Sequence, residues 1–203
     1  IMDLDEMISN NSFGVYREKA LPAEINFASL HGIGKQGTLL VLKKCNMITR
    51  PDPTEFVDTL SNYFGEIYRY FIRSGRKIKV NGKEINVIDP MWHDGILVEE
   101  YKQRSEIYSD ETYEIKSDGS NKKESFSAKI FILPQFDPSV MRKLKINQNN
   151  QGFYVMRNYR QIAKGVDLNG LWTKHNNLNR VRIEIIFSGS LDKVMGVNYT
   201  KHD

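Results

Sequence analysis

The stretch Arg180–Asp203 reads RVRIEIIFSGSLDKVMGVNYTKHD, and its first half is the clearest fold signal in the chain. Apolar residues alternate along Val181–Phe187, and this period of two predicts a strand with one buried face. Ser190 is placed to cap a short helical turn and Gly196 to end it. Lys201 follows on a loop after the strand, where a cation can be held against an anionic ligand. An ordinary solvated surface lysine is the competing interpretation.

The bulk composition is that of a globular protein with a substantial core. Of the 203 residues, 40% are hydrophobic and 27% are charged, and the net charge is +4. The single cysteine, Cys45, excludes an internal disulfide and fits a reducing compartment. No apolar run reaches the length of a membrane span, and Ile1–Asn10 is acidic, unlike a signal peptide. We therefore expect a cytoplasmic protein with no membrane partner.

The most secure helix is predicted over residues 53–74. Asp52 is suited to the N-cap, Pro53 to the first helical position, and Glu55 to a capping box, while Gly75 supplies the stop. The broad aromatic face of this helix is expected to pack on a sheet. Its apolar positions at helical spacing are Phe56, Leu60, Tyr63, Phe64, Ile67, Phe71 and Ile72.

Strands dominate the chain after this helix. Asn81-Gly82 and Asn158 are turn signals, and each predicts a β-hairpin. Together with one or two helical turns near Asp137–Leu144, this pattern predicts an α+β fold with a mixed or antiparallel sheet covered by helices. The predicted strands and hairpins span residues 77–87, 96–101, 112–116, 125–133, 152–162 and 181–187.

No self-sufficient active site is visible in the residues. The four histidines lack ligand spacing, which predicts no metal site, and no serine lies in a nucleophile-elbow motif. Gly32, Gly34 and Gly37 match G-x-G-x-x-G, but they precede a predicted strand (Thr38–Lys44), whereas a dinucleotide fingerprint follows one. The residues alone therefore favour a scaffold or binding module with no catalytic residue in this chain.

Several short motifs, in order, resemble the GHKL ATPases, the group that holds gyrase, MutL, the MORC proteins and the large heat-shock chaperones. Gly37-Thr38 before an apolar strand is similar to the last nucleotide-site motif of that group. The Asp89-Pro90 stop, with the helix and hairpin before it, resembles the start of the transducer domain that follows. Gly152–Ile162 resembles the strand, Arg-Asn, Arg-x-Ile hairpin of MutL-like and MORC-like members.

The segment Val197–His202 resembles the MutL loop whose lysine contacts the terminal phosphate of ATP. The resemblance therefore implies that Lys201 senses the phosphate and that Gly37 and Thr38 lie beside the nucleotide. It also implies that residues 1–50 end a nucleotide-binding domain and that residues 51–203 form a transducer. The implied fold is a ribosomal-protein-like βαβ sheet of about four strands with helices on one face.

The resemblance further implies partners that this chain lacks. The helix with the catalytic glutamate and the magnesium-binding asparagine is absent, so no ATP hydrolysis is expected from this chain alone. ATP and Mg would bind the full-length protein, with the missing N-terminal nucleotide-binding domain as partner and a homodimer as its possible assembly.

Two other functions remain open from the sequence. One is a plain interaction scaffold. The other is a nucleic-acid-binding module, because basic residues on neighbouring predicted strands can form a stripe. The residues of that stripe are Arg157, Arg160, Lys164, Lys174, Arg180 and Arg182.

Overall fold

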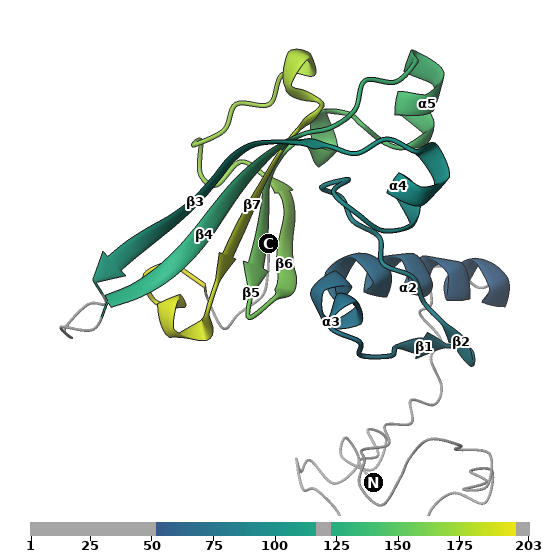
Figure 1. Cartoon of the computed structure of the whole chain (residues 1–203), viewed down its shortest axis with the longest axis horizontal. Helices are drawn as coiled ribbons and strands as arrows, with labels where there is room; N and C mark the ends of the chain where they lie inside the picture. Colours follow the sequence, from purple (N-terminus) through teal and green to yellow (C-terminus); the bar gives the residue numbers. More distant parts are fainter. Residues whose placement is uncertain (1–51, 117–122, 198–203) are drawn as a thin grey trace, which may run out of the picture. The chain divides into compact units, whose positions relative to one another are not determined.

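The computed structural model describes residues 52–116 and 123–197, which all belong to the unit Thr49–Asp203 of the chain. This part of the chain has an α+β fold, as predicted, with a five-stranded mixed sheet in the order β3-β4-β7-β5-β6 (Figure 1). This sheet has one strand more than the roughly four that the resemblance implied. The five strands are β3 (Glu106–Lys116), β4 (Lys123–Ile132), β7 (Val181–Phe187), β5 (Gly152–Arg157) and β6 (Arg160–Val166).

Strand β7 is the centre of the sheet, with β4 antiparallel on one side and β5 parallel on the other. The strand is present as predicted, but the prediction of a single buried face is wrong. Arg182 and Glu184, which alternate with the apolar residues, are each only 2% exposed. A strand with neighbours on both edges and a layer on both faces has no side open to water.

Register divides the side chains of β5 and β7 into two faces. Tyr154 pairs with Glu184, and Gly152 pairs with Arg182, so these residues share what we call the polar face. Val155 lies opposite Ile185 on the other face, which we call the apolar face together with Ile183 and Phe187. The parallel strands β5 and β7 are joined through β6 and residues 167–180, which include the short 3₁₀ helix η3 (Asn176–Leu178).

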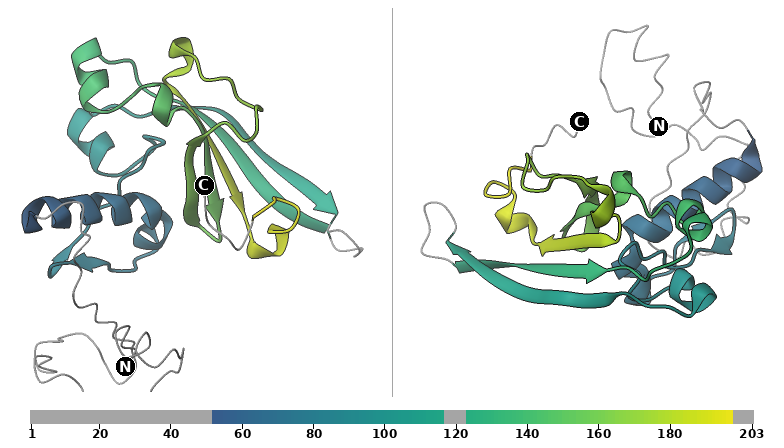
Figure 2. Two further views of the ribbon diagram at one scale, coloured as in Figure 1. Left: turned by 180° about the vertical axis from the view of Figure 1, so that it is seen from behind. Right: turned by 90° about the horizontal axis from the view of Figure 1, so that it is seen from above.

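The predicted helix begins as expected and is broken into two. In α2 (Pro53–Ile67) the Asp52 carboxylate accepts a hydrogen bond from the Glu55 amide at 2.8 Å. The helix is interrupted at Tyr68 and continues as α3 (Arg69–Arg73). Both helices contact β6, and α2 runs on past the edge of the sheet (Figure 2).

The expectation that the whole aromatic face of this helix packs on a sheet is therefore wrong. Phe56 is 37% exposed and Tyr63 is 58% exposed, whereas Ile67 is buried. The most buried part of α2 is the end that lies beside β6, and the helix also contacts β1.

Both predicted hairpins are confirmed. Asn81 and Gly82 have positive φ and join the two-stranded sheet of β1 (Lys79–Val80) and β2 (Lys83–Glu84). The turn between β5 and β6 consists of Asn158 (φ 49°) and Tyr159 (φ 63°), also both left-handed. This is the geometry of a two-residue hairpin turn.

The predicted strand over residues 96–101 is wrong, because this segment is helix α4 (Ile96–Tyr101). Leu97 and Tyr101 are four residues apart and both pack against the buried cluster of Trp92, Leu133 and Ile146, which is an arrangement that helical spacing allows. The expected helical turns after Asp137 are confirmed as α5 (Pro138–Lys143).

Candidate functional site

The tip of the β5–β6 hairpin is bonded to the turn that follows β7. Arg157 donates through Nε and Nη2 to the two carboxylate oxygens of Asp192, each at 2.6 Å. The Gly189 amide donates to the side-chain oxygen of Asn158 at 2.8 Å. We call Arg157, Asn158, Gly189 and Asp192 the hairpin clamp. A bidentate arginine–carboxylate pair fixes orientation as well as distance, so the turn is held in one position.

The clamp also affects the pKa of Asp192 and limits the size of the side chain that fits at position 189. Hydrogen bonds and charge from Arg157 hold the pKa of Asp192 below its usual range. A Cβ on Gly189 would lie 2.7 Å from Nη2 of Arg157, so a larger residue here would push the Arg157 side chain out of its position in the clamp.

The turn after β7 is anchored by its own residues as well. Ser188, rather than the predicted Ser190, occupies the N-cap of the 3₁₀ helix η4 (Gly189–Leu191), and Ser190 donates to Glu124 at 2.9 Å. Leu191 is fully buried against the apolar face. The turn ends, as predicted, at Gly196, whose φ is +66°.

The predicted nucleotide contacts lie outside the described residues. These contacts are Gly37, Thr38 and Lys201, and their assignment stays a prediction. The strand predicted over 38–44 also lies outside the described residues. The last described residue is Val197, which packs on the apolar face four positions before Lys201.

A buried ion network lies on the polar face of the sheet. Arg69 of α3 has no exposed surface and forms an ion pair with Glu184 of β7. It also donates to Oε1 of Gln161 on β6 at 2.6 Å. The Tyr70 hydroxyl donates to the second Glu184 oxygen at 2.6 Å. The network therefore ties α3 to the central strand through charges.

Asp89 extends this network into the segment after the first hairpin. Its carboxylate is 1% exposed and accepts hydrogen bonds from the amides of Met91, His93 and Asp94 at 3.1–3.3 Å. Arg73 lies 2.9 Å away. Burial raises the pKa of Asp89, and the charge of Arg73 opposes that rise. From the sequence, Asp89 was predicted only to end the hairpin that precedes it.

Two atoms on the polar face lack hydrogen-bond partners among the described residues. Nε of Arg69 lies 3.8 Å from Asp89, beyond hydrogen-bond range. Nε of Arg182 is also unpaired, although its Nη1 donates to the carbonyl oxygens of Asn179 and Val181. Desolvation lowers the pKa of Arg182 from its usual value.

Sequence reasoning missed the network because its members come from segments far apart in the chain. The one available signal was the charged pair at alternate positions of β7, where a strand at the centre of a sheet must bury both. The partners on α3 and in the 89–94 segment are fixed only by the tertiary fold.

The six basic residues of the predicted stripe do not form one stripe, although Arg157 and Arg160 are cross-strand partners in the β5–β6 hairpin. Arg182 is buried, and Arg180, at the same end of β7, donates to the Leu133 carbonyl oxygen at 2.7 Å. Arg157 lies at the end of β5, a strand length away, and is held in the clamp.

The other three basic residues are exposed, but they differ in their contacts. Lys164 on β6 forms an ion pair with Glu66 at 2.6 Å. Arg160, also on β6, lies with its guanidinium 5.8 Å from the ring centre of Tyr68. Lys174 lies in the loop before β7.

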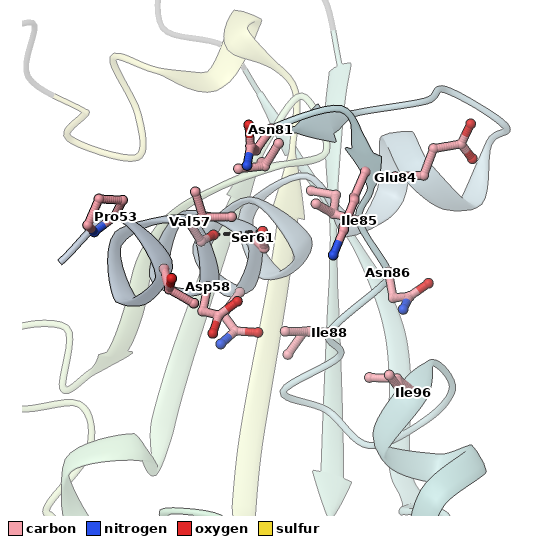
Figure 3. Close-up of a pocket in the computed structure, with 14 residues that line it drawn as sticks. Pro53, Val57, Asp58, Ser61, Asn81, Glu84, Ile85, Asn86, Ile88 and Ile96 are labelled. Atoms are coloured by element: carbon pink, nitrogen blue, oxygen red, sulfur yellow. Dashed lines mark hydrogen bonds between the residues drawn. The ribbon is translucent and has the colours of Figure 1, made fainter.

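A groove of about 500 Å³ lies between α2 and the segment that follows Asn81 (Figure 3). Val57, Ile85 and Ile88 form its apolar lining, and its polar edge includes Asp58 and Asn86. Ser61 also lines the groove, and its hydroxyl donates a hydrogen bond to the Val57 carbonyl oxygen at 2.7 Å.

In the described residues, no group of three or more histidine, cysteine, aspartate or glutamate side chains is arranged to hold a metal ion. No helix within residues 52–116 and 123–197 is long and apolar enough to cross a membrane. In comparisons with known proteins, no family model, curated protein or solved structure matches this chain.

Proposed function

We propose that this chain is the transducer part of a GHKL-type ATPase, which relays ATP binding and hydrolysis to a conformational change. The hairpin clamp is the observation that supports the proposal best. One motif on which the resemblance rests, the Arg-Asn hairpin, bonds to the turn 189–192 through partners that are 31 and 35 residues apart in the chain. This turn lies just before Val197–His202, the last motif of the resemblance, so the hairpin holds the stretch of chain that leads to it.

In this proposal the clamp gives Lys201 a fixed starting point. The chain from Gly189 to Val197 is held by Asp192, Gly189 and Leu191. A short segment leaving a rigid sheet can place an ammonium group accurately against a phosphate. When the terminal phosphate leaves, the lysine loses its partner, and the equilibrium between two positions of the transducer shifts.

The buried network offers a route from that segment to the helices. Glu184 lies on β7, the strand that runs into the clamped turn, and it is paired with Arg69 on α3. A displacement of β7 would therefore act on α3 through a buried charge pair, which does not tolerate separation.

The test is ATP turnover by the protein that contains this chain together with its nucleotide-binding domain. Lys201→Ala is expected to lower turnover roughly 10- to 100-fold, the effect of losing a hydrogen bond from a charged group. Lys116→Ala, which removes an exposed lysine at the end of β3, serves as the matched control and should leave turnover unchanged. Circular dichroism checks that both variants fold.

Arg157→Lys tests the contribution of the hairpin clamp while leaving Lys201 unchanged. The charge is kept but the bidentate geometry is lost, so turnover should fall while ATP affinity changes little. If the parent protein neither binds nor hydrolyses ATP, the proposal is wrong. If Lys201→Ala turns over ATP like the parent, Lys201 is not the sensor.

A further inference from the structure

An aromatic ladder runs along α2 and α3, formed by Tyr63, Phe64, Tyr68 and Phe71. Successive ring centres are 5.9, 5.9 and 6.1 Å apart. Tyr63 is 58% exposed, and the other three rings are partly exposed. Tyr63, Phe64 and Phe71 were expected to pack on a sheet, whereas Tyr63 is exposed and Phe64 and Phe71 are only half-buried.

Two arginines stack on the ladder. The Arg160 guanidinium lies 5.8 Å from the ring centre of Tyr68, and that of Arg76 lies 5.8 Å from the ring centre of Phe71. Both arginines are exposed, and neither forms an ion pair with a described carboxylate, in contrast to Arg73 beside them. Their charge is therefore available to an external anion, because a guanidinium can donate hydrogen bonds from its edge while its plane covers a ring.

A hollow of about 320 Å³ opens beside the ladder and is lined by Tyr70, Phe71, Ser74, Arg76 and Tyr159. Tyr159 is 57% exposed, and its ring centre is 5.5 Å from that of Tyr70. It occupies a left-handed turn position (φ 63°) that favours glycine. A bulky side chain kept at a strained, exposed position points to a use for its ring.

We propose that this surface binds single-stranded nucleic acid. Bases would stack on the ladder and on Tyr159, and Arg76 and Arg160 would contact the phosphates. Exposed rings interleaved with unpaired cations are the common features of sites that bind single strands without sequence preference. Duplexes fit less well, because their bases are already stacked and their edges, not their faces, are accessible.

The assignment rests on Arg76, Arg160 and the rings around them, and it is independent of the ATPase proposal. The basic stripe predicted from sequence shares only Arg160 with it. A purely apolar partner would leave the two arginine charges unmatched, whereas a phosphate backbone matches them.

The experiment is fluorescence anisotropy of the 203-residue chain with a labelled oligothymidylate of about 20 nucleotides, a length that exceeds one such site. Tyr63→Ala and Tyr159→Gly should each weaken binding roughly 5- to 160-fold, the range for loss of one stacked base. Tyr159→Gly should remain folded, because glycine is favoured at that turn position.

Charge is tested separately through the salt dependence of binding. Arg76→Gln and Arg160→Gln should each reduce the slope of log affinity against log salt concentration by about 0.7, the value for one phosphate contact on a single strand. Arg142→Gln on α5 and Tyr108→Ala on β3 remove an exposed arginine and an exposed tyrosine elsewhere, and should change nothing.

Three results would overturn the proposal. The first is no measurable binding to oligothymidylate or to an RNA of equal length. The second is equal affinity for a duplex with no effect of Tyr63→Ala or Tyr159→Gly, which would indicate charge attraction alone. The third is saturable binding of a proline-rich peptide that depends on Tyr159 when oligonucleotide binding does not, which would make this a peptide site.

Discussion

The apolar face of the sheet is covered by hydrophobic packing, whereas the polar face is held by charges. On the apolar face, Val155 and Phe187 pack against Leu191, which is fully buried. On the polar face, Arg69 and Glu184 are just as buried, and each depends on the other. The same central strand, β7, carries both kinds of contact.

The difference teaches how each face responds to change. Apolar packing is non-directional, so its loss is gradual and depends on the volume removed. A buried charge pair depends on matched partners, and removing one member leaves the other desolvated and uncompensated. The four predictions below test this contrast, in order of decreasing effect.

Arg69→Met is expected to have the largest effect, destabilising the protein by about 3–5 kcal/mol, the usual result of breaking a buried ion pair. Glu184 would lose its cationic partner and keep only the Tyr70 hydroxyl, Gln161 would lose the Arg69 donor, and Asp89 would lose a nearby cation. Urea unfolding followed by circular dichroism measures the change.

The double variant Arg69→Met/Glu184→Leu is the control for this prediction. Replacing a buried pair by apolar side chains is often close to neutral, so much of the lost stability should return. If the double variant is no more stable than Arg69→Met, uncompensated charge is not the cause.

Leu191→Ala should destabilise by about 3 kcal/mol, through lost burial and the cavity that remains on the apolar face. Leu171→Ala is the matched control, because Leu171 is 76% exposed and its truncation should be near neutral. Both are measured by the same urea unfolding. Equal losses from the two variants would contradict the packing described for Leu191.

Asp192→Asn tests the hairpin clamp through pH. The pKa of Asp192 is lowered in the folded state, so its stabilisation is present above its usual value of about 3.8 and is lost as pH falls through the folded-state pKa. The stability difference between the parent and Asp192→Asn should therefore be constant near neutral pH and shrink below about pH 4. Thermal unfolding over a pH series measures it. A difference that grows on acidification would contradict this sign.

Glu114→Gln should have the smallest effect, within about 0.5 kcal/mol, because exposed ion pairs contribute little. Glu114 lies 2.7 Å from Lys123, but both side chains are more than half exposed. Thermal unfolding at low and high salt checks it. If Glu114→Gln destabilised the protein as much as Arg69→Met, burial could not explain why the ion pair on the polar face matters more for stability.

Local signals in the sequence were enough for much of the secondary structure. The Asp52 cap, the Asn81-Gly82 turn and the strand over Val181–Phe187 each depend on residues close together in the chain, and all are present. The strand prediction for residues 96–101 was wrong because a short apolar run fits a strand or a helix, and packing on the cluster of Trp92, Leu133 and Ile146 favours the helix.

The candidate sites depended on contacts that no local pattern contains. The sequence identified Arg157 and Asn158 as a motif, but only the fold showed that they bind Asp192 and Gly189. The aromatic stripe was visible in the sequence, and its exposure followed from where α2 passes the edge of the sheet.

The α+β class, the hairpin turns and the helix cap can be predicted from the amino-acid sequence, because they follow from neighbouring residues and hydrophobic periodicity. The burial of Glu184 against Arg69 and the exposure of Tyr63 depend instead on the packing of the whole fold. Burial is set by how elements distant in sequence pack on one another, and periodicity shows which residues share a face but not what covers that face.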